Sequence, residues 1–227
     1  MNIVLFGGPG AGKDSIAKFL AEDFGLVHVS SGDIFRKHIA EQTEIGKSVK
    51  AYIDQGNLVP DELTIAIVMD RLAQDDCANG FILDGFPRTV AQASAFLKQK
   101  PIDAIVHISV DEETVVARLS GRYKCTTCHE PHNKLWHKGI ECSKCGGPLS
   151  QRDDDREEIV RKRFNDYKET ETAMLDFYKS LLVKVLPVES KLVDPPKSMY
   201  SRFLDDHVKS LNYIAATSKA KSKDVKK

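Results

Sequence analysis

A glycine-rich loop follows the first apolar run of the chain and constrains its fold more than any other feature. The run Ile3–Phe6 leads into the segment GGPGAGKDS at Gly7–Ser15, and a helical pattern follows. Glycines let the backbone turn tightly and present its N–H groups to an anion, while the start of the following helix favours negative charge. Lys13 adds a positive charge, and the Ser15 hydroxyl can reach a metal-bound phosphate. A plain glycine-rich turn is the alternative, but Lys13 in this strand–loop–helix setting favours a phosphate-binding site.

Strand-like and helix-like segments alternate along the rest of the chain. We expect strands at 3–6, 26–29, 81–83, 104–110 and 183–188, and helices at 15–24, from 34 onward, and at 46–55, 62–72, 90–99, 112–119 and 156–177. Asp61 and Asp111 are expected to cap two of these helices. The alternation predicts an α/β fold, a three-layer P-loop sandwich whose parallel sheet carries helices on both faces. Its ligands would lie at the carboxyl ends of the strands, where the loops at 7–15, 31–33 and 84–88 meet.

Composition narrows the functional class. The 227 residues contain 33 basic and 33 acidic side chains, so no global field attracts nucleic acid or membranes. No apolar run is long enough for a membrane span, and no secretory signal precedes the loop, so we expect a cytoplasmic protein. The Lys- and Ser-rich residues 215–227 predict a basic disordered tail; a solvated chain end and an anchor for anions are both possible interpretations.

A second candidate site follows the strand at 81–83. Asp84 could hold magnesium through its waters, and Arg88 could bind a phosphate with two parallel hydrogen bonds. Taken alone, the Asp84-Gly85 pair is only turn chemistry, but beside a phosphate loop it indicates function. Further arginines recur along the chain and could neutralise a transferring phosphoryl group: Arg36, Arg118, Arg122, Arg152 and Arg163.

The five cysteines indicate a metal site rather than a disulfide framework. Four of them form two CxxC pairs, Cys125/Cys128 and Cys142/Cys145, separated by 13 residues. This spacing suits a tetrahedral structural zinc site with four thiolates. His129, His132 and His137 lie between the pairs and could substitute as ligands, or be ordinary structural histidines. Metal binding would fold a core-poor segment into a rigid flap between Arg122 and Arg152 that excludes water from the site.

Several motifs in one order resemble the adenylate kinase family, in its long form with a zinc-bearing lid. They cover nearly the whole chain to about Val188: the phosphate loop, Ser31-Gly32-Asp33 with Arg36, Gly56 with Leu58-Val59, Asp84–Arg88 with Gln92, Leu119–Arg122, the four cysteines, and Gln151–Asp155 with Arg163. The resemblance implies a core (1–29, 60–121 and 153–214), a helical AMP-binding segment (30–59) inserted into it, and a zinc-stabilised lid (122–152).

The resemblance also implies a reaction and a set of site residues. The reaction would be reversible phosphoryl transfer from Mg·ATP to AMP, giving two ADP, in a monomer that binds no nucleic acid. Catalytic roles would fall on Lys13, Arg88, Arg122, Arg152 and Arg163. ATP would contact Gly10, Ala11, Gly12, Lys13, Asp14, Ser15, Arg118, Arg122, Pro131, His132 and Lys191. AMP would contact Ser31, Arg36, Asn57, Leu58, Val59, Gly85, Phe86, Pro87, Arg88, Gln92, Arg152 and Arg163. Zinc would be structural, and magnesium would accompany the nucleotide.

The chain departs from the family pattern most clearly at Asp14, where the family has glycine. An added negative charge beside a phosphate site predicts weaker ATP binding. Other functions remain open at this point: a UMP/CMP or other nucleoside monophosphate kinase, or a zinc-ribbon protein that binds nucleotides or nucleic acid. Gln92 and the long cysteine segment favour AMP, and the lack of net positive charge and of interleaved aromatic residues argues against nucleic acid.

Overall fold

A five-stranded parallel sheet forms the centre of the computed structural model, which describes residues 1–128, 130–191 and 196–224. Its strands lie in the order β2-β3-β1-β4-β8, and every neighbouring pair is parallel. Their bounds are β1 Asn2–Gly7, β2 Val27–Ser30, β3 Phe81–Asp84, β4 Ala104–Ser109 and β8 Lys184–Glu189. All five strands predicted from the sequence are confirmed. The chain adds β2 and β3 on one side of β1 and β4 and β8 on the other. The loop that follows β1 therefore lies at the centre of the edge formed by the carboxyl ends of the strands.

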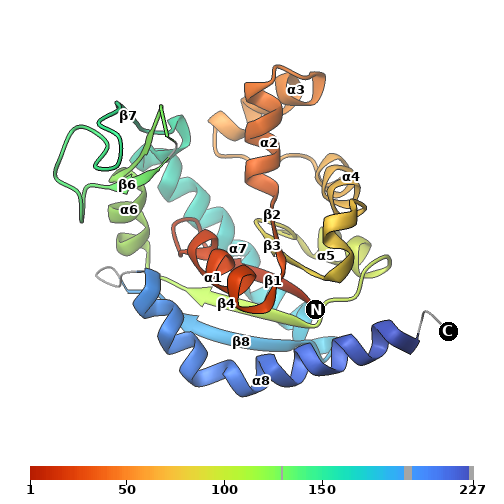
Figure 1. Ribbon diagram of the computed structural model, residues 1–227. Helices are drawn as coiled ribbons and strands as arrows, with labels where there is room; N and C mark the ends of the chain where they lie inside the picture. Colours follow the sequence, from red (N-terminus) through yellow and green to blue (C-terminus); the bar gives the residue numbers. More distant parts are fainter. Residues whose placement is uncertain (129, 192–195, 225–227) are drawn as a thin grey trace.

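Helices cover both faces of this sheet and give the predicted three layers (Figure 1). Successive residues of β1 point to opposite faces. Ile3 and Leu5 pack with α1 (Lys13–Phe24) and α8 (Pro196–Asp224). Val4 and Phe6 pack on the other face with α4 (Asp61–Leu72), α5 (Val90–Leu97) and α7 (Glu157–Ser180). Both halves of the core are therefore built from the same strand.

Two smaller units are inserted above the carboxyl edge of the sheet (Figure 1). Helices α2 (Ser31–Ala40) and α3 (Glu44–Asp54) join β2 to α4, and they have their own small core of Phe35, Val49 and Val59. The second unit follows α6 (Glu112–Ser120) and contains β5 (Arg122–Cys125), β6 (Pro131–Asn133) and β7 (Leu149–Ser150). These three strands form an antiparallel sheet in the order β6-β5-β7. Short 3₁₀ turns at Asp75–Asn79 and Asp153–Asp155 complete the elements.

Two local predictions at helix starts are corrected by the structure. Helix α2 begins at Ser31 rather than Ile34, because the Ser30 hydroxyl accepts the N–H of Asp33 and caps the helix there. Asp61 is not a cap; Pro60 occupies the N-cap of α4, and the Asp61 carboxylate turns toward α5 instead. Asp111, by contrast, caps α6 as predicted, accepting the N–H of Thr114.

Helix α8 overturns the predicted disordered tail. It runs to Asp224, so residues 215–224 are helical, whereas 225–227 lie outside the described residues. Phe203 and Leu211 are fully buried against the sheet face, and the Tyr200 hydroxyl donates to Asp23 of α1 at 2.6 Å. The polar end continues the helix because Ala and Lys are good helix formers once an anchored segment has nucleated it.

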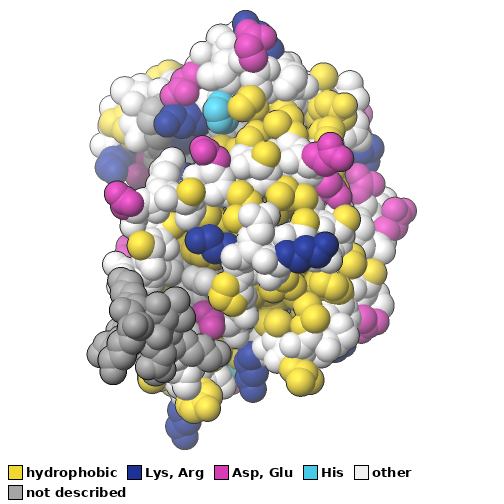
Figure 2. Space-filling view, turned by 90° about the vertical axis from the view of Figure 1, so that its right-hand side faces the viewer, with side chains coloured by type: hydrophobic (Ala, Val, Ile, Leu, Met, Phe, Trp, Pro, Cys, Tyr) yellow, Lys and Arg dark blue, Asp and Glu magenta, His cyan; other side chains and the backbone are white. Residues whose placement is uncertain are grey.

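The surface carries charges of both signs. On the face in Figure 2, acidic and basic side chains alternate with apolar ones and do not gather into a basic stripe. A membrane-spanning segment is not found among the described helices, because none combines sufficient length with sufficient apolar character.

Candidate active site

The phosphate loop lies between β1 and α1 and is shaped by left-handed glycines. Gly10 has φ 69° and Gly12 has φ 97°, a region that side chains other than glycine rarely adopt. Gly12 also occupies the N-cap of α1 and has no side chain to satisfy the first N–H groups of the helix. The Ser15 N–H donates to the Gly12 carbonyl at 3.1 Å, but those of Lys13 and Asp14 have no partner among the described residues and can face an anion, whose charge the helix N-terminus stabilises.

Lys13 folds back over this loop. Its Nζ donates to the carbonyl oxygens of Gly7 at 2.9 Å and Gly8 at 2.8 Å. Burial lowers the pKa of Lys13 to about 8, against a partly compensating attraction to Asp84 and together with repulsion from Arg88 and other arginines. Because the Lys13 ammonium is poorly hydrated, a phosphate that binds beside it would stabilise its charge strongly.

Asp84 ends β3 beside the loop and is 8% exposed. Burial by itself raises its pKa, but the proximity of the His28 ring and the charge of Lys13 outweigh that effect and hold the pKa below its usual range. His28 Nε2 lies 3.7 Å from Asp84 Oδ2. The ligand atoms of Asp14, His28 and Asp84 all lie within 4.8 Å of one another, so Asp14 extends this acidic corner toward the loop. An ionised carboxylate here suits a hydrated divalent cation.

Two adjacent pockets meet at the carboxyl edge of the sheet. One includes Gly7, Pro9 and Lys13 of the phosphate loop. The other is enclosed by the α2–α3 unit, and its lining includes the predicted AMP-side residues Ser31, Arg36, Asn57, Leu58, Val59, Gly85, Arg88, Gln92 and Arg163. Gly85, Arg88 and Arg163 line both pockets. Two guanidinium groups are therefore placed at the boundary, where they could contact ligands on either side. Arg152 is not among the lining residues of either pocket.

The second pocket has a closely connected floor. The buried Ser31 hydroxyl donates to the Gly85 carbonyl at 2.8 Å and joins the start of α2 to the end of β3. Gln92 is 2% exposed; its Oε1 accepts the N–H of Arg88 at 2.7 Å, and its Nε2 donates to Asp61 Oδ1 at 2.7 Å. Phe86 is 1% exposed and packs against Phe96 in the core, whereas the buried Pro87 lines the phosphate-loop pocket.

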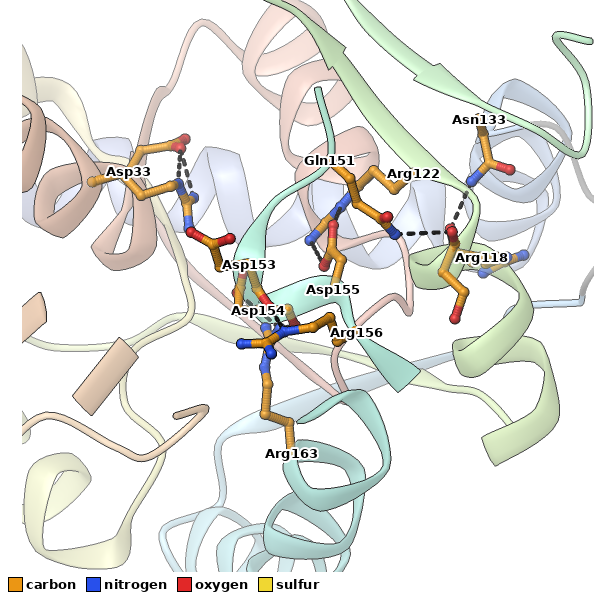
Figure 3. Close-up of polar contacts among 12 residues, drawn as sticks. Asp33, Arg118, Arg122, Asn133, Gln151, Asp153, Asp154, Asp155, Arg156 and Arg163 are labelled. Carbon is orange, nitrogen blue, oxygen red and sulfur yellow. Dashed lines mark hydrogen bonds and ion pairs between the residues drawn. The ribbon is translucent and has the colours of Figure 1, made fainter. Parts of the chain in front are cut away.

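Three of the six arginines around the site are held by carboxylates in this arrangement, and two of them are labelled in Figure 3. Arg122 makes a two-bonded pair with the fully buried Asp155, at 2.8 and 2.6 Å. Arg163 bonds Asp154 at 2.9 Å. Another pair joins Arg36 to Asp33 at 2.7 Å. Burial and the neighbouring guanidinium of Arg122 lower the pKa of Arg152 to about 10. Like charges are thus concentrated around the pockets, as an anion-binding site requires.

Three residues predicted to contact ATP lie outside the phosphate loop, although Arg118 forms a hydrogen bond with it. Arg118 is 9% exposed and donates to the carbonyl oxygen of Gly10 at 3.2 Å, to the Ser190 hydroxyl at 2.7 Å and to the carbonyl oxygen of Lys191. Pro131 is exposed on β6. His132 is 9% exposed, and its Nε2 lies 3.2 Å from Cys142 Sγ. His132 therefore lies beside the cysteines, and the ATP contacts of these three residues stay predictions.

The four cysteines of the second inserted unit converge as predicted. Their sulfur atoms all lie within 4.8 Å of one another, with Cys125–Cys145 and Cys128–Cys142 each at 3.5 Å. Tetrahedral zinc with bonds of about 2.3 Å requires sulfur separations of about 3.8 Å, so the set fits that ion. The N–H groups of Thr127 and Cys128 point at Cys125 Sγ, each at 3.4 Å, which favours a thiolate. His137 bonds the Glu141 carbonyl, and His129 lies outside the described residues.

Sequence reasoning missed the residues that support the site from behind. A Cβ on Gly8 would lie 3.2 Å from the Tyr167 ring, and one on Gly12 would lie 2.8 Å from Met199 Cε. Helices α7 and α8 thus pack directly on the phosphate loop. Neither contact has a local sequence signal, because both partners lie more than 150 residues away along the chain. The contact of Asp61 with Gln92, which are 31 residues apart, also has no local sequence signal.

Comparisons with known proteins agree with this geometry. The sequence model described as adenylate kinase matches residues 5–183. An adenylate kinase of Archaeoglobus fulgidus is 47% identical over 187 residues, covering 79% of this chain and 86% of that protein. One of Oceanobacillus iheyensis is 48% identical over 196 residues, covering 82% and 91%. One of Caldicellulosiruptor saccharolyticus is 43% identical over 209 residues, covering 88% and 97%.

Proposed function

The chain belongs to the adenylate kinase family, and we propose that it catalyses reversible transfer of the terminal phosphoryl group of Mg·ATP to AMP, giving two ADP. The observation that carries this proposal is the pair of adjacent pockets that share Arg88 and Arg163. One pocket includes the phosphate loop, which suits a nucleoside triphosphate. The other has Gln92 and a ring of arginines, which suits a nucleoside monophosphate.

In this arrangement the reaction needs positioning and positive charge more than covalent help from the protein. A phosphate oxygen of AMP attacks the terminal phosphorus of ATP, and the bond from that phosphorus to the bridging oxygen breaks. Lys13 moves from the loop carbonyls to the transferring group, and Arg88 and Arg163 neutralise its charge from the boundary. We propose that Arg122 and Arg152 join them when the second inserted unit (residues 122–152, hereafter the lid) closes over the triphosphate.

Lid closure would require Arg122 to loosen from Asp155. The phosphate charges offer this guanidinium an alternative two-bonded partner, so ligand binding and the exchange of partners would be coupled. Exclusion of water by the closed lid would protect ATP from hydrolysis.

Two metals fit the residues present. Magnesium bound with the nucleotide would neutralise phosphate charge, and Asp84 would orient it through water. Zinc held by Cys125, Cys128, Cys142 and Cys145 would be structural, since four protein ligands leave no open position. His132 would donate to Cys142 Sγ and stabilise the thiolate. We further propose that the enzyme acts as a cytoplasmic monomer without nucleic acid, which is consistent with the reduced cysteines and the balanced charge.

A coupled assay that offers ATP with AMP, CMP, UMP or GMP tests the function. We expect turnover with AMP well above the others; preference for a pyrimidine monophosphate would favour the UMP/CMP kinase alternative, and no turnover would reject the kinase. Lys13→Met should abolish turnover, while Lys37→Met, which removes an exposed lysine from α2, should leave it unchanged.

A further inference from the structure

We propose that Asp61 is the positioning residue that makes this kinase select a 6-aminopurine over a 6-oxopurine, because it prevents the Gln92 side-chain amide from turning over. The inference rests on the proposed function, since it assigns the base specificity of the second pocket. It concerns a residue that does not line that pocket.

The two ends of the Gln92 amide have different partners. Oε1 accepts the backbone N–H of Arg88 at 2.7 Å, and Nε2 donates to Asp61 Oδ1 at 2.7 Å. An amide nitrogen has two hydrogens and an amide oxygen accepts two hydrogen bonds. One donor and one acceptor therefore remain free for a ligand, in a fixed order along the amide.

That order matters because an unrestrained amide cannot distinguish adenine from hypoxanthine. Adenine presents a donor at its 6-amino group and an acceptor at N1; hypoxanthine presents an acceptor at O6 and a donor at N1. A glutamine that is free to rotate by a half-turn about its last bond pairs with either edge equally well. Selection thus requires the amide to be held in one orientation.

Asp61 supplies the restraint. A carboxylate only accepts hydrogen bonds, so turning the amide over would bring Gln92 Oε1 against a negatively charged oxygen. The same turn would bring Nε2 against the Arg88 N–H, placing two donors face to face. A buried mismatched pair of this kind is far more costly than a lost exposed bond.

The position of Asp61 is itself fixed from two elements. Its second oxygen, Oδ2, accepts the Thr89 hydroxyl at 2.9 Å, and Thr89 Oγ1 also accepts the N–H of Gln92 as the N-cap of α5. Asp61 stands in the first turn of α4, where a negative charge is stabilised by the helix dipole. Both carboxylate oxygens are therefore engaged, and the whole network lies between the starts of α4 and α5.

The test compares Asp61→Asn with the unaltered enzyme. Asparagine has nearly the same shape, but it can present either an amide oxygen or an amide nitrogen to Gln92, so the orientation is no longer enforced from this side. We measure KM for AMP and the inhibition constant of IMP as a competitor of AMP, both with saturating ATP. The ratio of the inhibition constant of IMP to the KM for AMP should fall by about tenfold, because the variant discriminates less against IMP. Asp70→Asn, which removes the same charge from an exposed aspartate on the same helix, should leave the ratio unchanged.

A second pair of variants separates positioning from a general structural role. In a Gln92→Ala background there is no amide to orient, so Asp61→Asn should no longer change the ratio. If Asp61→Asn does not fold, Asp61→Ala takes its place with the same expectation. An unchanged ratio in a folded variant, or an equal change in the Gln92→Ala background, would overturn the inference. Failure of the unaltered enzyme to use AMP would instead reject the proposed function.

Discussion

Removal of the negative charge at Asp14 should strengthen ATP binding. Asp14 lies in the first turn of α1 and is exposed, and its carboxylate is within 4.8 Å of the ligand atoms of His28 and Asp84. It therefore adds an anion to the corner where we place the magnesium-bearing triphosphate. Asp14→Gly and Asp14→Asn should both lower the KM for ATP and leave the KM for AMP unchanged.

The size of the effect follows from the charges and their exposure. Two unit charges about 5 Å apart in water interact by about 0.8 kcal/mol, and Mg·ATP carries about two net negative charges. Lys18 lies 3.3 Å from Asp14 and cancels part of this repulsion. If about half remains, the gain is about 0.8 kcal/mol, or about fourfold in KM. Asp14→Gly should also destabilise the fold by about 0.3 kcal/mol, because glycine is a slightly poorer helix former than aspartate.

Initial-rate kinetics at low and high ionic strength test the electrostatic origin. The fourfold difference should shrink as salt is raised, because exposed charges are screened. Glu22→Gln, an exposed change at the other end of α1, serves as the control and should leave the KM for ATP unaltered. An unchanged or raised KM for ATP in Asp14→Asn would refute the reasoning.

Three further changes probe the lid, the loop and the core. Cys142→Ser should release zinc and lower the melting temperature of the lid, whereas Cys77→Ser should retain zinc; equal zinc content by elemental analysis would contradict the four-cysteine site. Because burial lowers the pKa of Lys13 to about 8, kcat/KM for ATP should fall as pH rises through 8. In the unfolded chain Lys13 keeps its ordinary pKa of 10.5, so between pH 8 and 10.5 the folded chain binds fewer protons than the unfolded chain. The contribution of Lys13 to the free energy of unfolding should therefore rise with pH in that range. A pH–rate profile measures the effect on kcat/KM, and urea unfolding at pH 7 to 10 measures the effect on stability. Tyr178→Phe should raise the free energy of unfolding by about 1 kcal/mol, since that buried hydroxyl has no hydrogen-bond partner among the described residues, whereas Tyr200→Phe, which loses the bond to Asp23, should lower it by about as much.

Local patterns predicted much of this protein because their physical causes are local. The glycines and Lys13 of the phosphate loop, the five apolar strands and the CxxC spacing each specify their structure within a few residues of sequence. The structure confirms the α/β fold, brings the four sulfur atoms together, and groups most of the predicted AMP-side residues around one pocket. The contact of His132 with Cys142 was left open by the sequence, because which side of a short strand faces the cysteines depends on how the inserted unit folds.

The chain end shows the limit of composition. Its Lys- and Ser-rich residues resemble a disordered tail, yet α8 extends through them because Phe203 and Leu211, earlier in the same helix, are buried against the sheet. Helix formation is cooperative, so an anchored beginning determines the state of a polar end.

The sequence by itself determined which chemical groups this protein has: a glycine-rich loop suited to phosphate, arginines that could neutralise it, and four cysteines spaced for a metal. Tertiary structure decided which of these groups act together. It placed Arg88 and Arg163 between two pockets, paired Arg122 with Asp155, and set Asp61 against Gln92. These relations depend on the directions of side chains from elements that are distant in sequence, and such directions are fixed only when the helices pack on the sheet.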